Sequence, residues 1–224
     1  MSATDALAES LRSAFMNPDS SKRLNLAMNV GTFPSDSYID VLVDQFLVET
    51  DFYVRDTLTW ALLSQNREKV TQRIVAEINS PYPQMRSQCL HTLSKIGDPG
   101  TWSAITRKHL TDPNDAIAKT AWRAAVILVP DEDVSELIEV LCTQLGRGDS
   151  RTQLSLSKAL LSLGEPALEA LKKITSSENE VVRTHVENIM RIHKDHVAEY
   201  VKSIEAAKRN ESLTDAPTID QSII

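Results

Sequence analysis

Apolar residues recur every three or four positions along most of the chain, in segments separated by short polar stretches. Within 133–145, for example, Leu137, Val140, Leu141 and Leu145 fall on one side of a helical projection. This spacing is typical of amphipathic α-helices, whereas half-buried strands show a strict alternation of apolar and polar residues. The pattern therefore predicts an all-α protein.

The helical segments repeat with a period of about 32 residues. In DFYVRDTL the repeating unit places Arg55 at what we call the anchor position, and the same pattern recurs on both sides of it. The anchor positions along the chain are Arg23, Arg55, Arg86, Ala118, Gln153 and Arg183. A single helical unit cannot bury its apolar face alone, so such units are expected to stack around one extended core.

Another amphipathic segment lies about 16 residues before the anchors, so each unit is expected to be a pair of helices. The earlier segments cover 37–47, 67–78, 101–110, 133–145 and 166–174. The predicted boundaries carry the usual signals. Pro99 and Pro166 open helices, while Gly31, Gly97 and Gly164 follow helical runs as left-handed caps would.

The motif Asp-x-x-Val-Arg, with a small or apolar residue three positions further on, resembles the bacterial HEAT repeat. DFYVRDTL and ENEVVRTHV are the copies that match best, and the resemblance covers roughly residues 5 to 195. It implies a right-handed α-solenoid of about six HEAT-like helical hairpins. It also implies that Asp51 lies in the turn between two helices. The anchors Arg55, Arg86 and Arg183 would form a structural ladder, each reaching carboxylates or carbonyls of a neighbouring turn.

The two ends of the pattern set the expected domain organisation. HKDHVAEYVKSIEAAKRN, after the last anchor, has helical periodicity and is expected to form a C-terminal capping helix. We therefore predict a single repeat domain over 1–210 and a flexible tail over 211–224. In the middle of the stack, Ala118 and Gln153 depart from the motif, which predicts a looser or differently bonded ladder there.

Composition and charge fit this architecture and narrow the class of protein. Hydrophobic residues make up 42% of the chain and aromatics only 5%, which suits helix-on-helix packing. The net charge of −7 is spread evenly, so a broad phosphate-binding surface is not expected, although a local basic patch is compatible with it. The N-terminus has no signal-peptide pattern, and Cys89 and Cys142 fall in apolar helical patterns as free thiols. We therefore expect a cytoplasmic protein.

Sequence motifs for catalysis or for metal binding are missing from the chain. His193 and His196 are one helical turn apart, and a zinc site would need two further ligands. Asp195 and Glu199 are available nearby, but no Cys is close, so metal binding is not expected here. The HEAT-repeat enzymes that hold iron use His-Glu dipeptides, and the chain contains none. The Gly-x-Gly sequence at 145–150 follows no predicted strand and is expected to be a connecting loop. The sequence therefore predicts no catalytic residue, no metal and no cofactor.

The resemblance implies that the second helix of each pair lines the concave side of the stack. The residues one and five positions after each anchor are then expected to face this groove. The candidates for partner binding are Asp56, Trp60, His91, Lys119, Arg123 and Lys158. Tryptophan and arginine are enriched at binding hot spots, and the three cations would make the middle of the groove basic. The alternative is that these are ordinary solvated side chains, with Trp60 wedged between neighbouring helices.

These observations favour a non-catalytic scaffold or adaptor that binds a protein or peptide partner in its concave groove. The alternative is a nucleic-acid-binding protein related in shape to HEAT-like DNA glycosylases, which bind duplex on a concave basic surface with Trp, Asp and Arg. A lyase-like or chaperone subunit for a tetrapyrrole protein is a third reading, because short bacterial HEAT repeats occur there. No residue pattern specifically requires a pigment.

Overall fold

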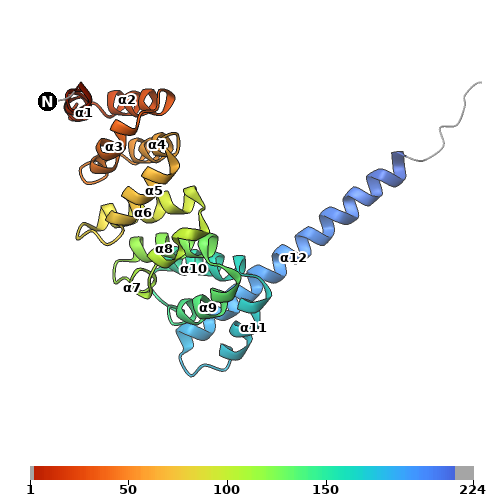
Figure 1. The fold of residues 1–224 in the computed structure, drawn as a ribbon. Coiled ribbons are helices and arrows are strands. Elements are labelled where there is room, and N and C mark those ends of the chain that lie inside the picture. Colours follow the sequence, from red (N-terminus) through yellow and green to blue (C-terminus); the bar gives the residue numbers. More distant parts are fainter. Residues whose placement is uncertain (1–2, 215–224) are drawn as a thin grey trace, which may run out of the picture.

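The computed structural model describes the backbone of residues 3–214, and this part of the chain is a stack of paired helices (Figure 1). No strand occurs within 3–214. The predicted all-α stack of helical hairpins is therefore confirmed. Each hairpin contributes a first helix and a second helix, and the second helices of neighbouring hairpins pack on one another.

Most of the first helices are short, and three of the pairs begin with a 3-10 turn. They are α1 (Ala3–Phe15), η1 and α3 (Asp36–Tyr38, Ile39–Gln45), α5 (Arg67–Glu77), η2 and α7 (Pro99–Ala104, Arg107–Leu110), η3 and α9 (Asp131–Asp133, Val134–Cys142) and α11 (Glu165–Ile174). The second helices are α2 (Ser20–Thr32), α4 (Phe52–Leu63), α6 (Pro83–Ile96), α8 (Asp115–Leu128), α10 (Ser150–Ser162) and α12 (Glu180–Thr214). The anchor position predicted from the sequence is the fourth residue of every one of these second helices.

The hydrophobic core is continuous along the stack and lies between the two helix layers. Leu58 of α4, Leu90 of α6 and Leu160 of α10 are fully buried in it. Trp122 of α8 is also fully buried, and its indole N–H donates to the carbonyl of Leu110 at 2.8 Å. Because each hairpin covers the apolar side of the next, the core extends with the number of repeats.

Most of the second helices begin at an Asp or Asn whose side chain caps the first turn. Asp51 accepts hydrogen bonds from the backbone N–H groups of Tyr53 and Val54, at 2.8 and 3.1 Å. Asp19, Asn114 and Asp149 cap α2, α8 and α10 in the same way. These acceptors satisfy backbone donors that have no partner within the helix. The Asp of the repeating motif is thus the residue that starts the second helix.

The segment 101–110 does not form the continuous helix that its periodicity predicts. It divides into η2 and α7, because Ile105 adopts an extended conformation between them. Thr106 then starts α7 with a capping box in which the His109 ring accepts from the Thr106 backbone N–H at 3.1 Å. A hydroxyl residue followed three positions later by a side-chain acceptor restarts a helix, so the local capping signal prevails over the apolar period.

The glycine predictions have different outcomes. Gly97 ends α6 in the left-handed conformation, with φ 64° and ψ 34°, as predicted. The prediction for Gly31 is wrong, because this residue lies inside α2 and has no positive φ. A Cβ atom on Gly31 would come within 2.2 Å of the Trp60 ring. Glycine is therefore required at position 31 by the close approach of an aromatic side chain, not by a helix end.

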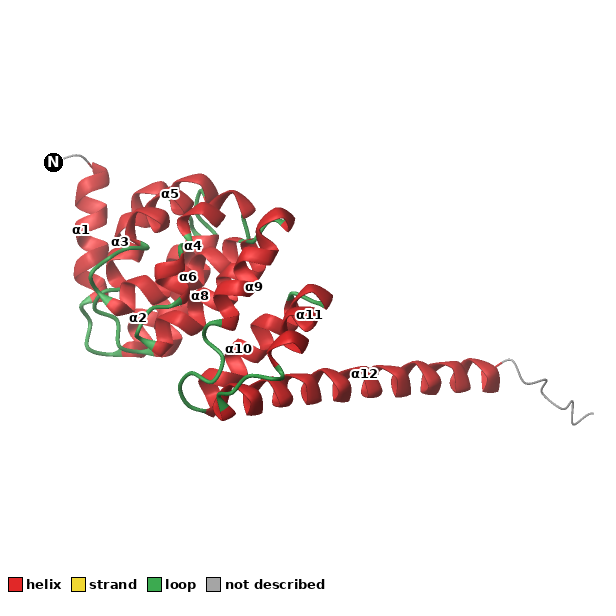
Figure 2. Ribbon diagram, turned by 90° about the horizontal axis from the view of Figure 1, so that it is seen from below, coloured by secondary structure: helices red, strands yellow, loops and turns green. Residues whose placement is uncertain are grey.

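The segment predicted to form a separate capping helix continues α12, which is 35 residues long. No Gly or Pro occurs between Glu180 and Thr214, so nothing in the local sequence ends the helix. His185, Val186 and Ile189 are buried against the stack, whereas Val197 is exposed. Figures 1 and 2 show the C-terminal half of α12 extending away from the other helices. Most of the predicted flexible tail, residues 215–224, lies outside the described residues.

None of the helices between residues 3 and 214 combines the length and the apolar character needed to cross a membrane.

Candidate partner-binding groove

The arginines at the anchor positions bind the backbone of the turn that precedes their own helix. Arg55 Nη1 donates to the carbonyls of Glu49 and Thr50, at 3.0 and 2.9 Å. Arg23, Arg86 and Arg183 make the same pair of bonds, to the carbonyls six and five positions earlier. These carbonyls lie in the turn after the first helix of the pair, where no helical donor follows them. The anchor arginine thus ties the two helices of a hairpin together.

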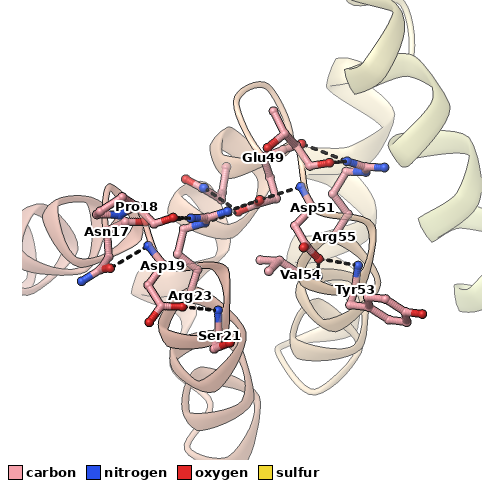
Figure 3. Close-up of polar contacts among 12 residues, drawn as sticks. Asn17, Pro18, Asp19, Ser21, Arg23, Glu49, Asp51, Tyr53, Val54 and Arg55 are labelled. Atoms are coloured by element: carbon pink, nitrogen blue, oxygen red, sulfur yellow. Dashed lines mark hydrogen bonds and ion pairs between the residues drawn. The ribbon is translucent and has the colours of Figure 1, made fainter.

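The outer edge of the guanidinium contacts a carboxylate of the next turn in two of the repeats. Arg23 donates from Nε and Nη2 to the two oxygens of Glu49, both at 2.7 Å (Figure 3). Arg86 Nη2 lies 3.4 Å from an oxygen of Asp112. Each of these acids stands 26 positions after its arginine. The anchor arginines therefore bond within one turn and, in these two cases, between neighbouring turns.

At the anchor without a long side chain, Ala118, an arginine from the following turn takes over part of the role. Arg147 donates to the carbonyl of Asp112, six positions before Ala118, and its Nε lies 2.8 Å from an Asp115 oxygen. Its guanidinium also stacks over the ring of Trp122, 5.9 Å from the centroid. The next anchor, Gln153, makes only two bonds of 3.4 Å to turn carbonyls.

Two adjoining cavities lie along the layer of second helices. The first is about 420 Å³ and is formed by α4, α6 and α8; the second is about 260 Å³ and is formed by α6, α8 and α10. His91, Thr120 and Arg123 line both cavities. Because these three residues line both, the two cavities lie next to each other, and we call them together the second-helix groove.

The groove brings together four of the six residues proposed for partner binding. Asp56, His91 and Arg123 line the first cavity, and Lys158 joins His91 and Arg123 in the second. Trp60 and Lys119 line neither of the two cavities. The Trp60 ring instead lies over Gly31 of α2 and remains 46% exposed.

The second cavity is positively charged. Lys95, Arg123 and Lys158 line it, and no carboxylate does. Its floor is apolar, with Val126 and the exposed Ile127 contributed by α8. A groove with apolar contact area between cations fits a ligand that carries both apolar groups and negative charges.

The opposite end of the groove carries one acid. Asp56 is exposed, and one of its oxygens lies 3.7 Å from His91 Nε2. Burial and the nearby Lys95 lower the pKa of His91, and the contact with Asp56 only partly opposes them. His91 is therefore uncharged at neutral pH, and the positive charge of the groove comes from the lysines and Arg123.

Several residues of the groove were missed by the sequence analysis. Lys95, Val126 and Ile127 lie eight or nine positions after their anchors, one turn beyond the positions that were considered. In a helix, positions one, five and eight or nine share one face. The same periodicity would have identified Lys95 as a third cation of the groove.

Among the residues whose side chains the structure describes, no group of three His, Cys, Asp or Glu is placed to hold a metal ion. Burial raises the pKa of the Cys89 thiol to about 12 and that of Cys142 to about 11. Both thiols are therefore protonated at neutral pH, the unreactive form of cysteine.

Two buried histidines make stability depend on pH. His109 Nε2 bonds to the Ile78 carbonyl at 3.2 Å, while His185 Nδ1 accepts from the Gly146 N–H at 2.9 Å and its Nε2 lies 3.0 Å from the Gln153 carbonyl. Burial lowers the pKa of both rings, although the carbonyl contacts act in the opposite direction. The folded protein therefore keeps both rings neutral at a pH where the unfolded chain binds protons.

We expect the melting temperature to fall as the pH is lowered below about 6.5, the pKa of an unperturbed histidine. The stabilisation is complete above that value and is lost as the pH drops toward the lower folded-state pKa. For a chain of this size each kcal/mol corresponds to roughly 2–4 °C. Thermal unfolding followed by circular dichroism between pH 7.5 and 5.5 measures how the melting temperature depends on pH. His109→Gln/His185→Gln should flatten the slope, whereas His193→Gln/His196→Gln should not; equal slopes would contradict the assignment.

The fold and the groove define a helical-repeat protein with a hollow along its second helices. No protein-family profile matches the sequence, and no curated protein does. Among solved structures, an engineered protein is 19% identical with a TM-score of 0.43, covering 82% of this chain and 57% of that one. The chain thus spans little more than half the length of that structure.

Two natural proteins have a similar arrangement of helices. The complex of CpcE and CpcF of phycocyanin lyase from Nostoc sp. PCC7120 is 19% identical with a TM-score of 0.47, covering 80% of this chain and 74% of that one. Human deoxyhypusine hydroxylase in complex with glycerol is 13% identical with a TM-score of 0.44, covering 86% and 97%. At these values the likeness concerns the arrangement of helices and carries no inference about activity or ligand.

Proposed function

We propose that this protein is a non-catalytic scaffold that binds an acidic, amphipathic peptide segment of a protein partner in the second-helix groove. The observation that carries the proposal is the second cavity, where Lys95, Arg123 and Lys158 surround an apolar floor without any lining carboxylate. In a chain with a net charge of −7, such a concentration of cations around apolar surface is a local feature and not a reflection of the composition.

The dimensions of the groove suit a peptide. It runs across four second helices, from α4 to α10. Neighbouring packed helices lie about 8–10 Å apart, so the groove is roughly 25–30 Å long. An extended segment of about eight residues, or a helix of about 18, spans that length. The exposed Ile127 offers apolar contact area, while the surrounding cations supply charge complementarity and faster association.

Nucleic acid is the alternative ligand, because Lys95, Arg123 and Lys158 could also contact phosphates. Asp56 at the other end of the groove and the acidic net charge act against a polyanion that extends over the whole surface. The affinity of the protein for duplex DNA at low salt, compared with its affinity for acidic peptides, distinguishes the two kinds of ligand. Binding that falls steeply with salt and exceeds peptide binding would favour the nucleic-acid function.

The proposal predicts which peptides the protein selects. Random 12-residue peptides displayed on phage and panned on the wild-type protein should become enriched in Asp or Glu next to apolar residues. Arg123→Glu/Lys158→Glu should bind the selected peptides at least tenfold more weakly, because two attractive charges become repulsive. Fluorescence anisotropy with labelled peptides measures the affinities.

The matched control is Lys108→Glu/Lys173→Glu, which changes the net charge equally but alters exposed residues of the first helices α7 and α11. It should bind within twofold of the wild type. If no acidic peptide is enriched, or if both double variants bind alike, the groove is not the binding site.

A further inference from the structure

Among the described residues, two anchor arginines, Arg55 and Arg183, have no carboxylate contact, and of these two only Arg55 lines the groove. The outer edges of Arg23 and Arg86 meet Glu49 and Asp112, each 26 positions further along the chain. The equivalent position for Arg55 is Pro81, which has no polar side chain. Among the described residues, only the two turn carbonyls bond to the Arg55 guanidinium, and both bond to Nη1. Its Nε and Nη2 hydrogens are therefore without a partner.

The unpaired edge belongs to the wall of the groove. Arg55 lines the first cavity together with Asp56, Gln84 and Gln88. In Figure 3 its guanidinium lies at the end of the chain of bonds that runs from Arg23 through Glu49 and its turn. Gln84 uses its amide N–H to hold the carbonyls of Phe46 and Glu49, at 2.6 and 2.8 Å, so it stabilises the turn without reaching the arginine.

The fold itself shows what this edge of the guanidinium binds. At Arg23 the Nε and Nη2 atoms each lie 2.7 Å from one of the two oxygens of a single carboxylate, which is the bidentate geometry favoured by Arg and carboxylate. Arg55 has the same place in its helix and holds its turn through the same two carbonyl bonds. A planar fork that is already fixed on one side loses little rotamer freedom when the other side is occupied.

We propose that the first cavity receives an Asp or Glu side chain of the bound peptide, and that its carboxylate pairs with the Nε and Nη2 edge of Arg55. The ligand would thereby supply the acid that the chain lacks at Pro81. This inference rests on the proposed peptide-binding function. It gives Arg55 a role in binding in addition to the structural one, and it places the peptide across α4 and α6 as well as over the basic second cavity.

The test uses Arg55→Lys, which keeps the positive charge but removes the fork. Its control is Arg183→Lys, because Arg183 holds its own turn through the equivalent carbonyls of Ser177 and Glu178 and lines neither cavity. Both variants should lose similar stability. Arg55→Lys should bind the selected acidic peptides about tenfold more weakly, as expected for loss of a charge-assisted pair, and Arg183→Lys within twofold of wild type.

Replacing each acidic residue of one selected peptide in turn by its amide identifies the paired group. At one position the replacement should cost about tenfold with the wild type and nothing with Arg55→Lys, which is the signature of direct coupling. The Nε–Hε signal of Arg55, assigned by its loss in Arg55→Lys, should shift in the NMR spectrum with the parent peptide and not with that amide variant.

The possible failures are distinct. If the wild type selects acidic peptides and Arg123→Glu/Lys158→Glu abolishes binding, but Arg55→Lys equals Arg183→Lys, only the pairing at Arg55 is overturned. Absence of acidic peptides from the selection overturns the proposed function and the pairing together. If Arg55→Lys weakens duplex DNA binding and leaves peptide binding unchanged, the edge binds phosphate and the carboxylate proposal is also overturned.

Discussion

Replacing Glu49 with glutamine is expected to lower the free energy of unfolding by about 3 kcal/mol at pH 7, as is usual when one partner of a buried ion pair is removed. The Glu49 side chain has no exposed surface and accepts four hydrogen bonds. Two come from Arg23, one from the backbone N–H of Asp51 at 2.9 Å and one from Gln45 at 3.2 Å. A glutamine turns its NH₂ group toward some of these donors and leaves the Arg23 guanidinium without its carboxylate.

The loss should depend on pH in a defined direction. Burial by itself raises the pKa of Glu49, but the hydrogen bonds from Arg23, Asp51 and Gln45 outweigh it and hold the pKa below its usual value. A carboxyl whose folded pKa is below its unfolded pKa stabilises the protein above about pH 4.3, and the stabilisation is lost as the pH falls through the folded value. The difference between the wild type and Glu49→Gln should therefore shrink below about pH 4.

Urea unfolding at pH 7 and at pH 3.5, followed by circular dichroism, measures both effects. Asp40→Asn is the matched control, because Asp40 pairs with Arg73 at 2.9 Å but its side chain is 70% exposed. Exposed pairs contribute about 0–1 kcal/mol, so this variant should change little at either pH. If both variants lose the same free energy of unfolding, the buried ion pair between Arg23 and Glu49 does not stabilise the stack.

The repeat architecture could be predicted because each repeat encodes its own start. An Asp or Asn caps most of the second helices, and the anchor is the fourth residue of each. The start of each second helix could therefore be predicted from the local sequence alone. The segment 101–110 could not be predicted in the same way. There the capping box of Thr106 and His109 competes with the apolar period, and the outcome depends on tertiary contacts such as that between His109 and Ile78.

The bonding at Ala118 depends on a change in repeat length. The spacing from Ala118 to Gln153 is the longest between anchors, and the additional residues form a loop in which Gly146 and Gly148 have φ of 81° and 68°. This loop directs Arg147 back to the preceding turn. A motif search can detect that an arginine is missing at an anchor, but the sequence does not show that another repeat supplies one.

The groove was partly predictable because helical periodicity assigns faces. Asp56, His91, Arg123 and Lys158 lie where the pattern placed them, along the two cavities. The unpaired edge of Arg55 could not be foreseen from the motif. It arises because position 81, 26 residues after Arg55, is a proline, whereas Arg23 and Arg86 contact an acid at that distance. The position of Trp60 depends equally on a neighbour, since only the glycine at 31 lets the ring approach α2.

Gly31→Ala is expected to destabilise the protein by about 2 kcal/mol, although alanine normally stabilises a helix by about 1 kcal/mol over glycine. The added methyl group would lie 2.2 Å from one ring atom of Trp60 and 2.7 Å from another, so the ring must leave its site on α2. Trp60 is 46% exposed, so roughly half of its surface is covered in the folded protein and would become solvated. At about 25 cal/mol per Å², that loss exceeds the gain in helix propensity.

The Trp60→Ala background should reverse the sign of the effect. With the ring removed, no clash remains, and Gly31→Ala should stabilise the protein by roughly 0.5–1 kcal/mol through helix propensity. The coupling between the two positions is then about 3 kcal/mol, at the upper end of what residues in contact show. Urea unfolding of the four proteins, followed at 222 nm so that loss of tryptophan fluorescence does not interfere, gives the cycle. If Gly31→Ala changes stability equally in both backgrounds, the Trp60 ring is not the reason that position 31 requires glycine. Sign reversal would assign Trp60 a packing role, whereas a role in partner binding would require that Trp60→Ala also weakens peptide binding.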